Sequence, residues 1–331
     1  MLARRALLIS ATAVFAVSLA APAVARSDKP IPVVATFSIL GDMVKRIGGE
    51  HVAVTTLVGP DGDTHVYQPT PAAARAVSEA KILVVNGLQF EGWLDRLIDA
   101  SDFDGIRVVA TDGIKPIAFD DEHDHGGSLE VHAEEAGHDH DHEARAEAGH
   151  DHDHHGAFDP HAWQSLRNAA VYVDNITEAL AKADPGNAGV FHWNREAYAA
   201  EIETLDSEIR EIVASLPADR RTVVTSHDAF RYFGRDYGLA FIAPQGLSTK
   251  SEAFATDVAR LIRQIRHGGI RAVFIENIGD PRLLSRIADE TGAAIGGTLY
   301  PGALSGPDGP APTYLDMMRH NATTLAQALT S

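Results

Sequence analysis

The chain has 331 residues, of which 45% are hydrophobic, and its formal net charge is −18 at pH 7. A chain this acidic is a poor match for nucleic acid and a suitable one for a cation. It contains no cysteine, so we expect no disulfide and no cysteine-linked lipid anchor. Its length exceeds what one hydrophobic core usually covers, which predicts two domains.

The first 25 residues have the features of a secretory signal peptide. Two arginines precede an apolar run at 6–21, and small residues follow up to Ala25. The run is short for a membrane span, and polar residues come directly after it. We therefore expect cleavage after Ala25 and a mature protein in the periplasm.

Short apolar runs alternate with amphipathic stretches from residue 31 to residue 100. Strands are expected at 32–39, 52–59 and 81–87, and helices at 42–49, 70–80 and 91–100. This alternation is typical of βαβ units, in which a parallel sheet is covered by helices on both faces. The pattern predicts an N-terminal α/β lobe over residues 26–186.

A tract at 120–156 holds ten of the seventeen histidines, thirteen acidic residues and one basic residue, Arg145. The motif EAGHDHDH at 135–142 returns at 147–154, which a plain acidic linker would not require. Because the tract has almost nothing apolar to bury, we expect it to be disordered without metal and to bind ions loosely. Its predicted accessory metal ligands are His123, His125, His132, His138, His140, His142, His150, His152, His154 and His155.

The second half of the chain starts with two helical patterns and then repeats the alternation. The helices are expected at 161–183 and 187–215, separated by the breaker at 184–186. Further strands are expected at 221–226, 239–244, 272–277 and 293–298, with helices through Tyr232, at 250–267, at 281–291 and from 312 onward. The predicted fold class is therefore α/β, with two βα lobes whose parallel sheets are joined by a single long helix at 187–216. The C-terminal lobe is expected at 217–331, and a metal cleft between the lobes.

Three histidines outside the tract lie in loops. His65 and His227 each follow a predicted strand, and His161 lies in the segment DPHAW. Ligands of open parallel sheets bind at the carboxyl ends of the strands, so His65 and His227 are well placed for a shared site. Taken singly, a loop histidine is more often a surface residue than a ligand, and the argument rests on the three together.

The sequence resembles a known family, the solute-binding proteins of zinc and manganese ABC importers, called ZnuA-like or TroA-like. The resemblance covers nearly all of the mature chain. It is carried by the segments ATFSILGDMV, GDTHVYQPTPAAARAVSEAKILVVNGLQFEGW, DPHAWQSLRNAAVYVDNI, VVTSHDAFRYFGRDYGL and TYLDMMRHN. It implies two βα lobes bridged by a long helix, with a metal bound between them for delivery to a membrane permease.

The resemblance also implies the site and the partners. It assigns ligand roles for Zn²⁺ to His65, His161 and His227, and the histidine at the third place is similar to the zinc subgroup and its AztC-like members. The implied partners are the zinc ion and an inner-membrane ABC permease with its cytoplasmic ATPase. A periplasmic metallochaperone is a further candidate partner, and the protein itself is expected to be a monomer.

One position departs from the family pattern. The fourth ligand of the family is usually an aspartate, and the corresponding segment at 298–305 has Gly302 in its place. Three alternatives stay open: Glu276 approaches the cleft, Asp308 folds in from its loop, or the ion is held by three histidines and water. Three neutral imidazoles alone would leave the charge of the ion uncompensated.

The sequence thus predicts a periplasmic zinc-binding protein that delivers Zn²⁺ to an ABC permease for import, and no enzyme. The alternatives are a solute-binding protein for manganese or another divalent metal, and a periplasmic zinc buffer without a transporter. A zinc hydrolase would also use three histidines and water, but the chain has no HExxH motif and no recognisable general base.

Overall fold

The computed structural model describes residues 29–118 and 157–330. The predicted signal peptide and the histidine-rich tract at 120–156 lie outside these residues and remain predictions. In the part of the chain that the structure describes, no helix is long and apolar enough to span a membrane.

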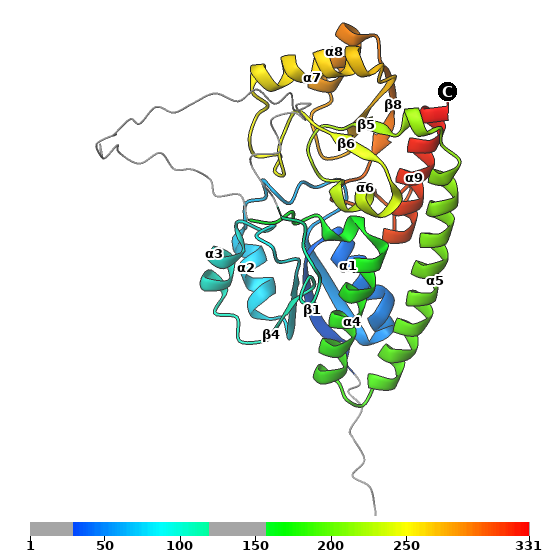
Figure 1. Ribbon diagram of the computed structural model, residues 1–331. Helices are drawn as coiled ribbons and strands as arrows, with labels where there is room; N and C mark the ends of the chain where they lie inside the picture. The colour runs from blue at the N-terminus through cyan, green and yellow to red at the C-terminus, as the bar shows by residue number, and fades with distance from the viewer. Residues whose placement is uncertain (1–28, 119–156, 331) are drawn as a thin grey trace, which may run out of the picture.

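Two four-stranded parallel sheets form the centres of two lobes, which confirms the predicted fold class (Figure 1). The first sheet has the order β2-β1-β3-β4, and the second the order β6-β5-β7-β8. The strands of the first sheet are β1 (Ile31–Phe37), β2 (Val52–Val58), β3 (Ile82–Val85) and β4 (Ile106–Val109). Those of the second are β5 (Thr222–Val224), β6 (Ala240–Ile242), β7 (Ala272–Glu276) and β8 (Ala294–Leu299).

The inner strands read as continuous apolar runs because helices cover both of their faces. All four residues of β3 are buried, and so are six of the seven residues of β1. Strand β4 was absent from the sequence-based prediction. It has only four residues, including the exposed Arg107, so it carries too little periodicity to be recognised without its neighbour β3.

Nine α-helices and three short 3-10 helices complete the described part of the chain. The N-terminal lobe contains α1 (Ser38–Gly48), η1 (Gly49–His51), α2 (Pro71–Ser78), α3 (Leu94–Ser101), η2 (Ala162–Gln164) and α4 (Leu166–Ala183). Helix α5 (Ala188–Ala214) follows. The C-terminal lobe contains η3 (Ala218–Arg220), α6 (Arg231–Tyr237), α7 (Ala255–Gly268), α8 (Arg282–Thr291) and α9 (Tyr314–Thr330).

Helix α5 runs along the side of the molecule past both lobes (Figure 1). It packs against α1 and α4 at one end and against α6 and α9 at the other. Its 27 residues lie inside the range 187–216 that the sequence predicts for the linking helix. The exact domain limits stay a prediction.

The two lobes share one hydrophobic core. A single cluster of buried residues includes Val33 of β1, Leu205 of α5, Phe274 of β7 and Met317 of α9. A second, smaller cluster lies between β7 and the helices α7 and α8. Because the larger core crosses from one sheet to the other, the lobes are packed together and not merely tethered.

Candidate metal centre

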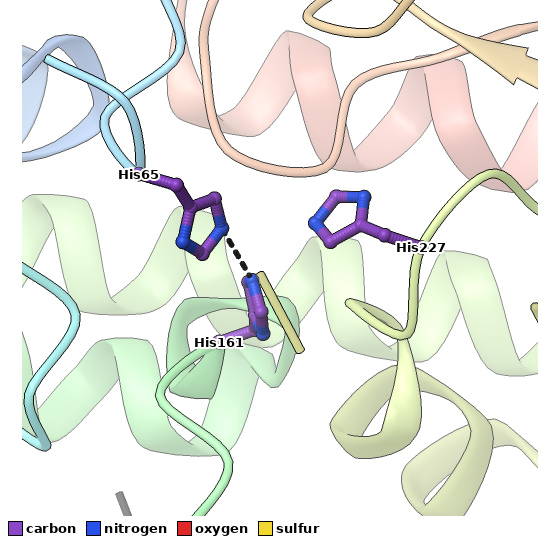
Figure 2. Close-up of side chains that lie close together, drawn as sticks. All are labelled: His65, His161 and His227. Carbon is purple, nitrogen blue, oxygen red and sulfur yellow. Dashed lines mark hydrogen bonds between the residues drawn. The ribbon is translucent and has the colours of Figure 1, made fainter. Parts of the chain in front are cut away.

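Three histidine side chains that are far apart in the sequence come together between the two sheets (Figure 2). One ring nitrogen from each of His65, His161 and His227 lies within 4.8 Å of the other two. The Nε2 atoms of His65 and His161 are 3.3 Å apart. Two nitrogens bound tetrahedrally to one zinc ion at about 2.0–2.1 Å would be separated by roughly the same distance.

Each histidine comes from a loop at the end of an element. His65 lies in the loop after β2, His161 directly precedes η2, and His227 lies in the loop after β5. The ends of parallel strands meet at one edge of each sheet, and the two edges face each other across the site. His161 and His227 are fully buried and His65 is half-buried.

Asp159 fixes the ring of His161 and the backbone that carries it. Its Oδ1 accepts hydrogen bonds from the backbone N–H and from the ring Nδ1 of His161, both at 2.9 Å. Both side chains are almost completely buried. The Nε2 atom of His161 therefore faces the other two histidines.

Glu276, the last residue of β7, holds His227 in the same way. Its Oε2 lies 2.6 Å from the ring Nδ1 of His227. Its Oε1 accepts hydrogen bonds from the backbone N–H groups of Ser226 (3.0 Å) and His227 (3.2 Å). Both oxygens of this carboxylate are thus engaged, and the Nε2 atom of His227 is buried with no hydrogen-bond partner in the described part of the chain.

Burial sets the protonation of the site. It lowers the pKa of His161 well below its usual range, and the neighbouring His227 ring adds to this effect. Burial acts on His227 in the same direction, but the charge and hydrogen bond of Glu276, together with the charges of Asp63 and Asp228, raise the pKa of that ring above its usual value. Burial also raises the pKa of Asp159 to about 7, against the hydrogen bond from the His161 N–H and the charge of Arg231. His161 is therefore neutral near pH 7, as a metal ligand must be.

Aromatic rings enclose one side of the histidines. The ring of Phe90 contacts that of His65 edge to face, with centroids 4.8 Å apart. The Trp163 ring lies 5.3 Å from that of His161 and 4.7 Å from that of Phe90. A cleft of about 680 Å³ borders His65 and Phe90, and Leu247 and Ser248 also line it. A larger groove of about 1080 Å³ between α2 and α3 contains none of the three histidines.

The loop that carries His65 is attached to the C-terminal lobe. The hydroxyl of Thr249 donates to Asp63 Oδ2 (2.5 Å), while Asp63 Oδ1 accepts from the backbone N–H of His65 (2.9 Å). Asp61, two residues before Asp63, makes a second contact of this kind: its Oδ1 accepts a hydrogen bond from Asn277 Nδ2 (2.9 Å). His65 therefore depends on contacts from both lobes for its position.

The remaining residues that the sequence singled out lie as follows. Glu276 contacts Nδ1 of the His227 ring, on the side away from the other two histidines, and is a hydrogen-bond partner of that ring. Asp308 is exposed, in a turn closed by the Gly309 N–H and the Gly306 carbonyl (2.9 Å), and does not join the histidine group. Gly302 is buried, and a Cβ atom placed there would lie 3.7 Å from Trp163 and 3.9 Å from Ile278.

Sequence reasoning missed Asp63 and Asp159. Both stand two residues before a candidate ligand, in the tripeptides DTH and DPH, and both accept the backbone N–H of that histidine. An aspartate that binds the N–H two residues later is the usual Asx-turn. The repeated Asp-x-His spacing was the signal that could have identified them.

Comparison with known proteins shows the same architecture. Residues 33–328 match the family model ZnuA, described as zinc-uptake complex component A, periplasmic. The chain is 32% identical to the zinc-binding protein TroA of Treponema pallidum, over 92% of this chain and 90% of that protein. It is 30% identical to the manganese-binding lipoprotein MntA of Halalkalibacterium halodurans (90% and 88%) and to the iron-binding protein YfeA of Yersinia pestis (90% and 86%).

Solved structures agree with the sequence matches. The periplasmic zinc-binding protein TroA from Treponema pallidum superposes with a TM-score of 0.76 at 29% identity, covering 91% of this chain and 99% of that one. The Mn-bound periplasmic metal-binding protein from Candidatus Liberibacter asiaticus gives a TM-score of 0.73 at 30% identity, covering 91% and 100%. Together with the buried histidine group, these matches show that the chain belongs to the ZnuA family of periplasmic metal-binding solute-binding proteins of ABC transporters.

Proposed function

We propose that this protein captures Zn²⁺ in the periplasm through His65, His161 and His227 and delivers it to an ABC permease for import. The observation that carries the proposal is the group of three converging imidazole nitrogens. Imidazole nitrogen suits Zn²⁺, whereas Mn²⁺ favours carboxylate and carbonyl oxygens. The relatives named above include zinc, manganese and iron binders, so the choice of metal rests on the donor atoms.

The fourth position of the proposed site is taken by water or a small anion from solvent. Both oxygens of Glu276 are already engaged, and Asp308 is exposed in its turn. A zinc site with three protein ligands and one exchangeable ligand is well known in proteins. An exchangeable ligand also suits a carrier, which must release its ion to the permease.

The histidines of the tract at 120–156 are proposed as an accessory store that raises the zinc concentration near the site. We further propose that the signal peptide is cleaved after Ala25 and that the mature protein acts as a monomer. Its partners are then the inner-membrane permease with its cytoplasmic ATPase, and a periplasmic metallochaperone that supplies zinc.

Metal content and competition titrations of the purified protein test the proposal. We expect the three-histidine site to hold one Zn²⁺ tightly and to bind Zn²⁺ far more tightly than Mn²⁺. The His227→Ala variant should lose this tight Zn²⁺ binding. At a free zinc concentration 100 times the Kd, binding should stabilise the fold by about 2.7 kcal/mol, visible as a higher Tm that a chelator reverses. Equal or tighter binding of Mn²⁺ would refute the zinc assignment.

Two rival functions give different results. A periplasmic zinc buffer would bind the ion equally well but would have no permease, so gene neighbourhood and zinc uptake by a deletion strain separate it from an importer. A zinc hydrolase would cleave an activated ester in its zinc-loaded form and lose that activity in His227→Ala. We expect no such activity.

A further inference from the structure

Two of the three candidate ligands have a buried carboxylate bonded to the side of the ring that faces away from the site. Asp159 contacts Nδ1 of His161, and Glu276 contacts Nδ1 of His227. Neither carboxylate belongs to the group of candidate ligand atoms. Burying an unpaired carboxylate costs free energy of folding, so a buried carboxylate at this place calls for a structural or functional explanation.

Glu276 is fixed by its place in the second sheet and by backbone hydrogen bonds. It ends β7, which is the neighbour of β5 in the second sheet, and His227 follows β5 in the chain. The two backbone N–H groups that donate to Oε1 leave only Oε2 to face the ring. The carboxylate therefore reaches His227 with a defined orientation.

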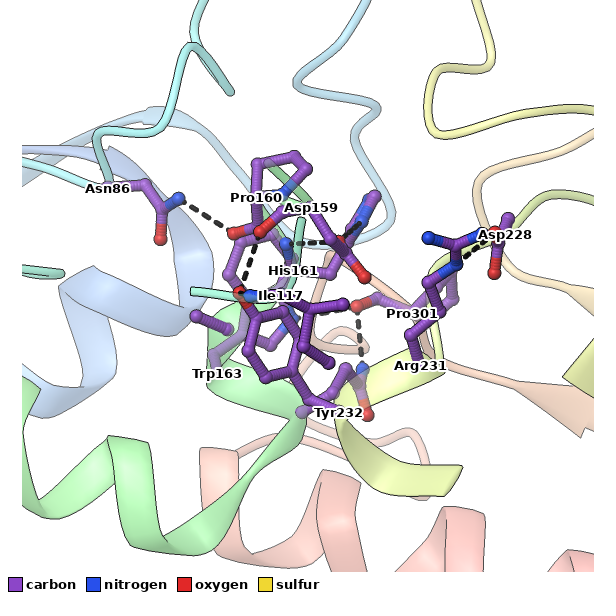
Figure 3. A network of polar contacts seen from close by, with 12 residues as sticks. Asn86, Ile117, Asp159, Pro160, His161, Trp163, Asp228, Arg231, Tyr232 and Pro301 are labelled. Atoms are coloured by element: carbon purple, nitrogen blue, oxygen red, sulfur yellow. Dashed lines mark hydrogen bonds and ion pairs between the residues drawn. The ribbon is translucent and has the colours of Figure 1, made fainter. Parts of the chain in front are cut away.

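Asp159 is fixed by a separate network that joins both lobes (Figure 3). Its backbone N–H donates to the Ile117 carbonyl (2.9 Å), and its own carbonyl accepts from the Tyr232 hydroxyl (2.8 Å). The same hydroxyl accepts from the Ile117 N–H (3.1 Å), and Asn86 Nδ2 donates to the next carbonyl, that of Pro160 (2.9 Å). The Asp159 side chain is thus held against His161 by contacts from three segments.

An acceptor at Nδ1 decides which neutral form each ring adopts. An ionised carboxylate can only accept, so beside it the proton of the neutral ring stays on Nδ1 and the lone pair is on Nε2. Nε2 is the atom that faces the other histidines in both cases. A carboxylate behind a ligating imidazole also strengthens the ring as a donor and commonly changes metal affinity by 10- to 100-fold.

We propose that Asp159 and Glu276 are positioning residues of the metal site, which set the tautomers of His161 and His227 and balance the charge of a divalent ion in place of the carboxylate missing at Gly302. The inference rests on the proposed zinc function and deepens it. With two carboxylates behind the rings, all three protein ligands remain nitrogen atoms, and the charge of Zn²⁺ is offset without an oxygen ligand. The site can therefore select zinc with only three protein ligands.

Conservative variants separate orientation from charge. In Glu276→Gln, the two backbone N–H donors keep the amide oxygen in the Oε1 position, which turns the NH₂ group toward Nδ1 of His227. Two donors then face each other, and the ring should move its proton to Nε2. In Asp159→Asn one oxygen can still accept both bonds from His161, so the tautomer should stay while the charge is lost.

The matched control is Glu91→Gln. Glu91 is as buried as Glu276, with exposed fractions of 5% and 4%, and it also accepts backbone N–H groups, those of Asn86 (2.7 Å) and Gly87 (3.3 Å). Its other hydrogen bond comes from the Thr36 hydroxyl and none from a histidine ring. This variant removes a buried charge and should leave both tautomers and the zinc affinity unchanged.

The first readout is the tautomer in the full-length, metal-free protein, measured from long-range ¹H–¹⁵N spectra of ¹⁵N-histidine-labelled samples at about pH 9, where imidazoles are neutral. Signals are assigned by their loss in His161→Ala and His227→Ala. We expect Nδ1–H at both rings of the parent protein, and Nε2–H at His227 in Glu276→Gln only. The second readout is zinc affinity by competition, which should fall about 10- to 100-fold in Glu276→Gln and about tenfold in Asp159→Asn.

Several results would overturn the proposal. One is an Nε2–H tautomer at His161 or His227 in the parent protein. This measurement needs no variant, so it tests the proposal even if Glu276→Gln fails to fold. Another is a Glu276→Gln protein that keeps both the parent tautomer and the parent affinity. A parent protein that binds no zinc would instead refute the proposed function, because the tautomers are measured without metal.

Discussion

His65 and His161 each follow an aspartate by two residues. Both aspartates accept the backbone N–H of their histidine, but their second contacts differ. Asp159 also bonds the ring of its histidine, whereas Asp63 bonds Thr249 of the other lobe. The first contact orients a ligand atom, and the second holds the loop that carries one. Residues beside the ligands thus determine where the three nitrogens meet.

We expect that a carboxylate at residue 302 would complete the site. The segment that contains Gly302 lies against the turn that carries His161, because the Pro301 carbonyl accepts from Trp163 Nε1 (2.8 Å) and Gln164 Nε2 (2.7 Å). A side chain at residue 302 has room for its Cβ atom. We expect Gly302→Asp to tighten zinc binding by roughly tenfold, since a carboxylate ligand replaces a weakly held one.

Competition titration of Gly302→Asp against Gly302→Asn measures this gain. The asparagine has nearly the same shape without the charge, so it should bind zinc about as the parent does. An unchanged affinity in the aspartate variant would mean that the fourth position is already filled from elsewhere.

At the scale of elements, loops at the strand ends and not the strands themselves carry the site. The loop after β2 is fastened to the second lobe by Thr249 and Asn277, and its backbone at Asp61 donates to the Leu304 carbonyl (2.8 Å). Trp93 from the N-terminal lobe donates to the Thr64 carbonyl (2.9 Å). The loop therefore joins two lobes at the point where His65 enters the site.

Thr249→Val should loosen this loop. The substitution preserves the shape of the side chain and removes its hydrogen bond to Asp63, a contact worth about 1.5–3 kcal/mol when a charged acceptor is involved. We expect faster hydrogen exchange at residues 61–66 and a zinc affinity about tenfold weaker. The exposed Thr204→Val on α5 is the control, and equal exchange in the two variants would contradict a role for the Thr249 contact.

At the scale of the whole molecule, the two lobes behave as one packed body. The core that runs through α5 and α9 is continuous, and Tyr314 at the start of α9 adds polar contacts to the first lobe. Its backbone N–H donates to Asp42 Oδ2 on α1 (2.9 Å), and its hydroxyl donates to the Trp163 carbonyl (2.6 Å). The shared core and these contacts therefore hold the two lobes together on either side of the three histidines.

Asp42 gives this interface a pH dependence. Burial raises its pKa above the usual value, against the lowering effect of the Tyr314 N–H and of Arg46. A raised pKa means that the folded state binds the proton more tightly, so stability falls as the pH rises from the unfolded pKa, about 3.9, through the folded one. Asp42→Asn keeps an acceptor for Tyr314 and should be more stable than the parent at about pH 7.

Urea unfolding at several pH values tests the predicted direction of this change in stability. The advantage of Asp42→Asn should disappear below about pH 4, where both states of the parent carry the proton. The exposed Asp104→Asn is the control. A constant difference at every pH would show that the effect comes from packing and not from the charge.

Removal of the histidine-rich tract should leave the fold and the three-histidine site intact. Ala118 and Phe158 pair as an antiparallel bridge, and the Asp159 N–H reaches the Ile117 carbonyl, so the residues on either side of 119–156 are already neighbours. A short Gly-rich turn can join them. We expect a free energy of unfolding within about 1 kcal/mol of the parent.

Calorimetric zinc titration of this deletion should retain the high-affinity site and lose the weaker ones. Uptake by cells grown at low zinc should slow. If the deletion abolished high-affinity binding, the tract would be part of the selective site and the division of tasks proposed above would be wrong.

Local sequence patterns were enough to predict the two parallel sheets, the long helix between them and the three candidate histidines. Apolar runs, helical periodicity and strand-end loops are local patterns, and they can be read without knowing the neighbours. Strand β4 was missed because the exposed Arg107 interrupts its short apolar run.

The contacts that support the three histidines became visible only in the folded chain. Glu276 is 49 residues from His227 and was considered as a ligand, yet it lies behind the ring because β7 and β5 are neighbours in the sheet. Likewise, Tyr232 holds Asp159 from another lobe, 73 residues away. Such contacts depend on how strands and lobes are placed relative to one another, which no local pattern records.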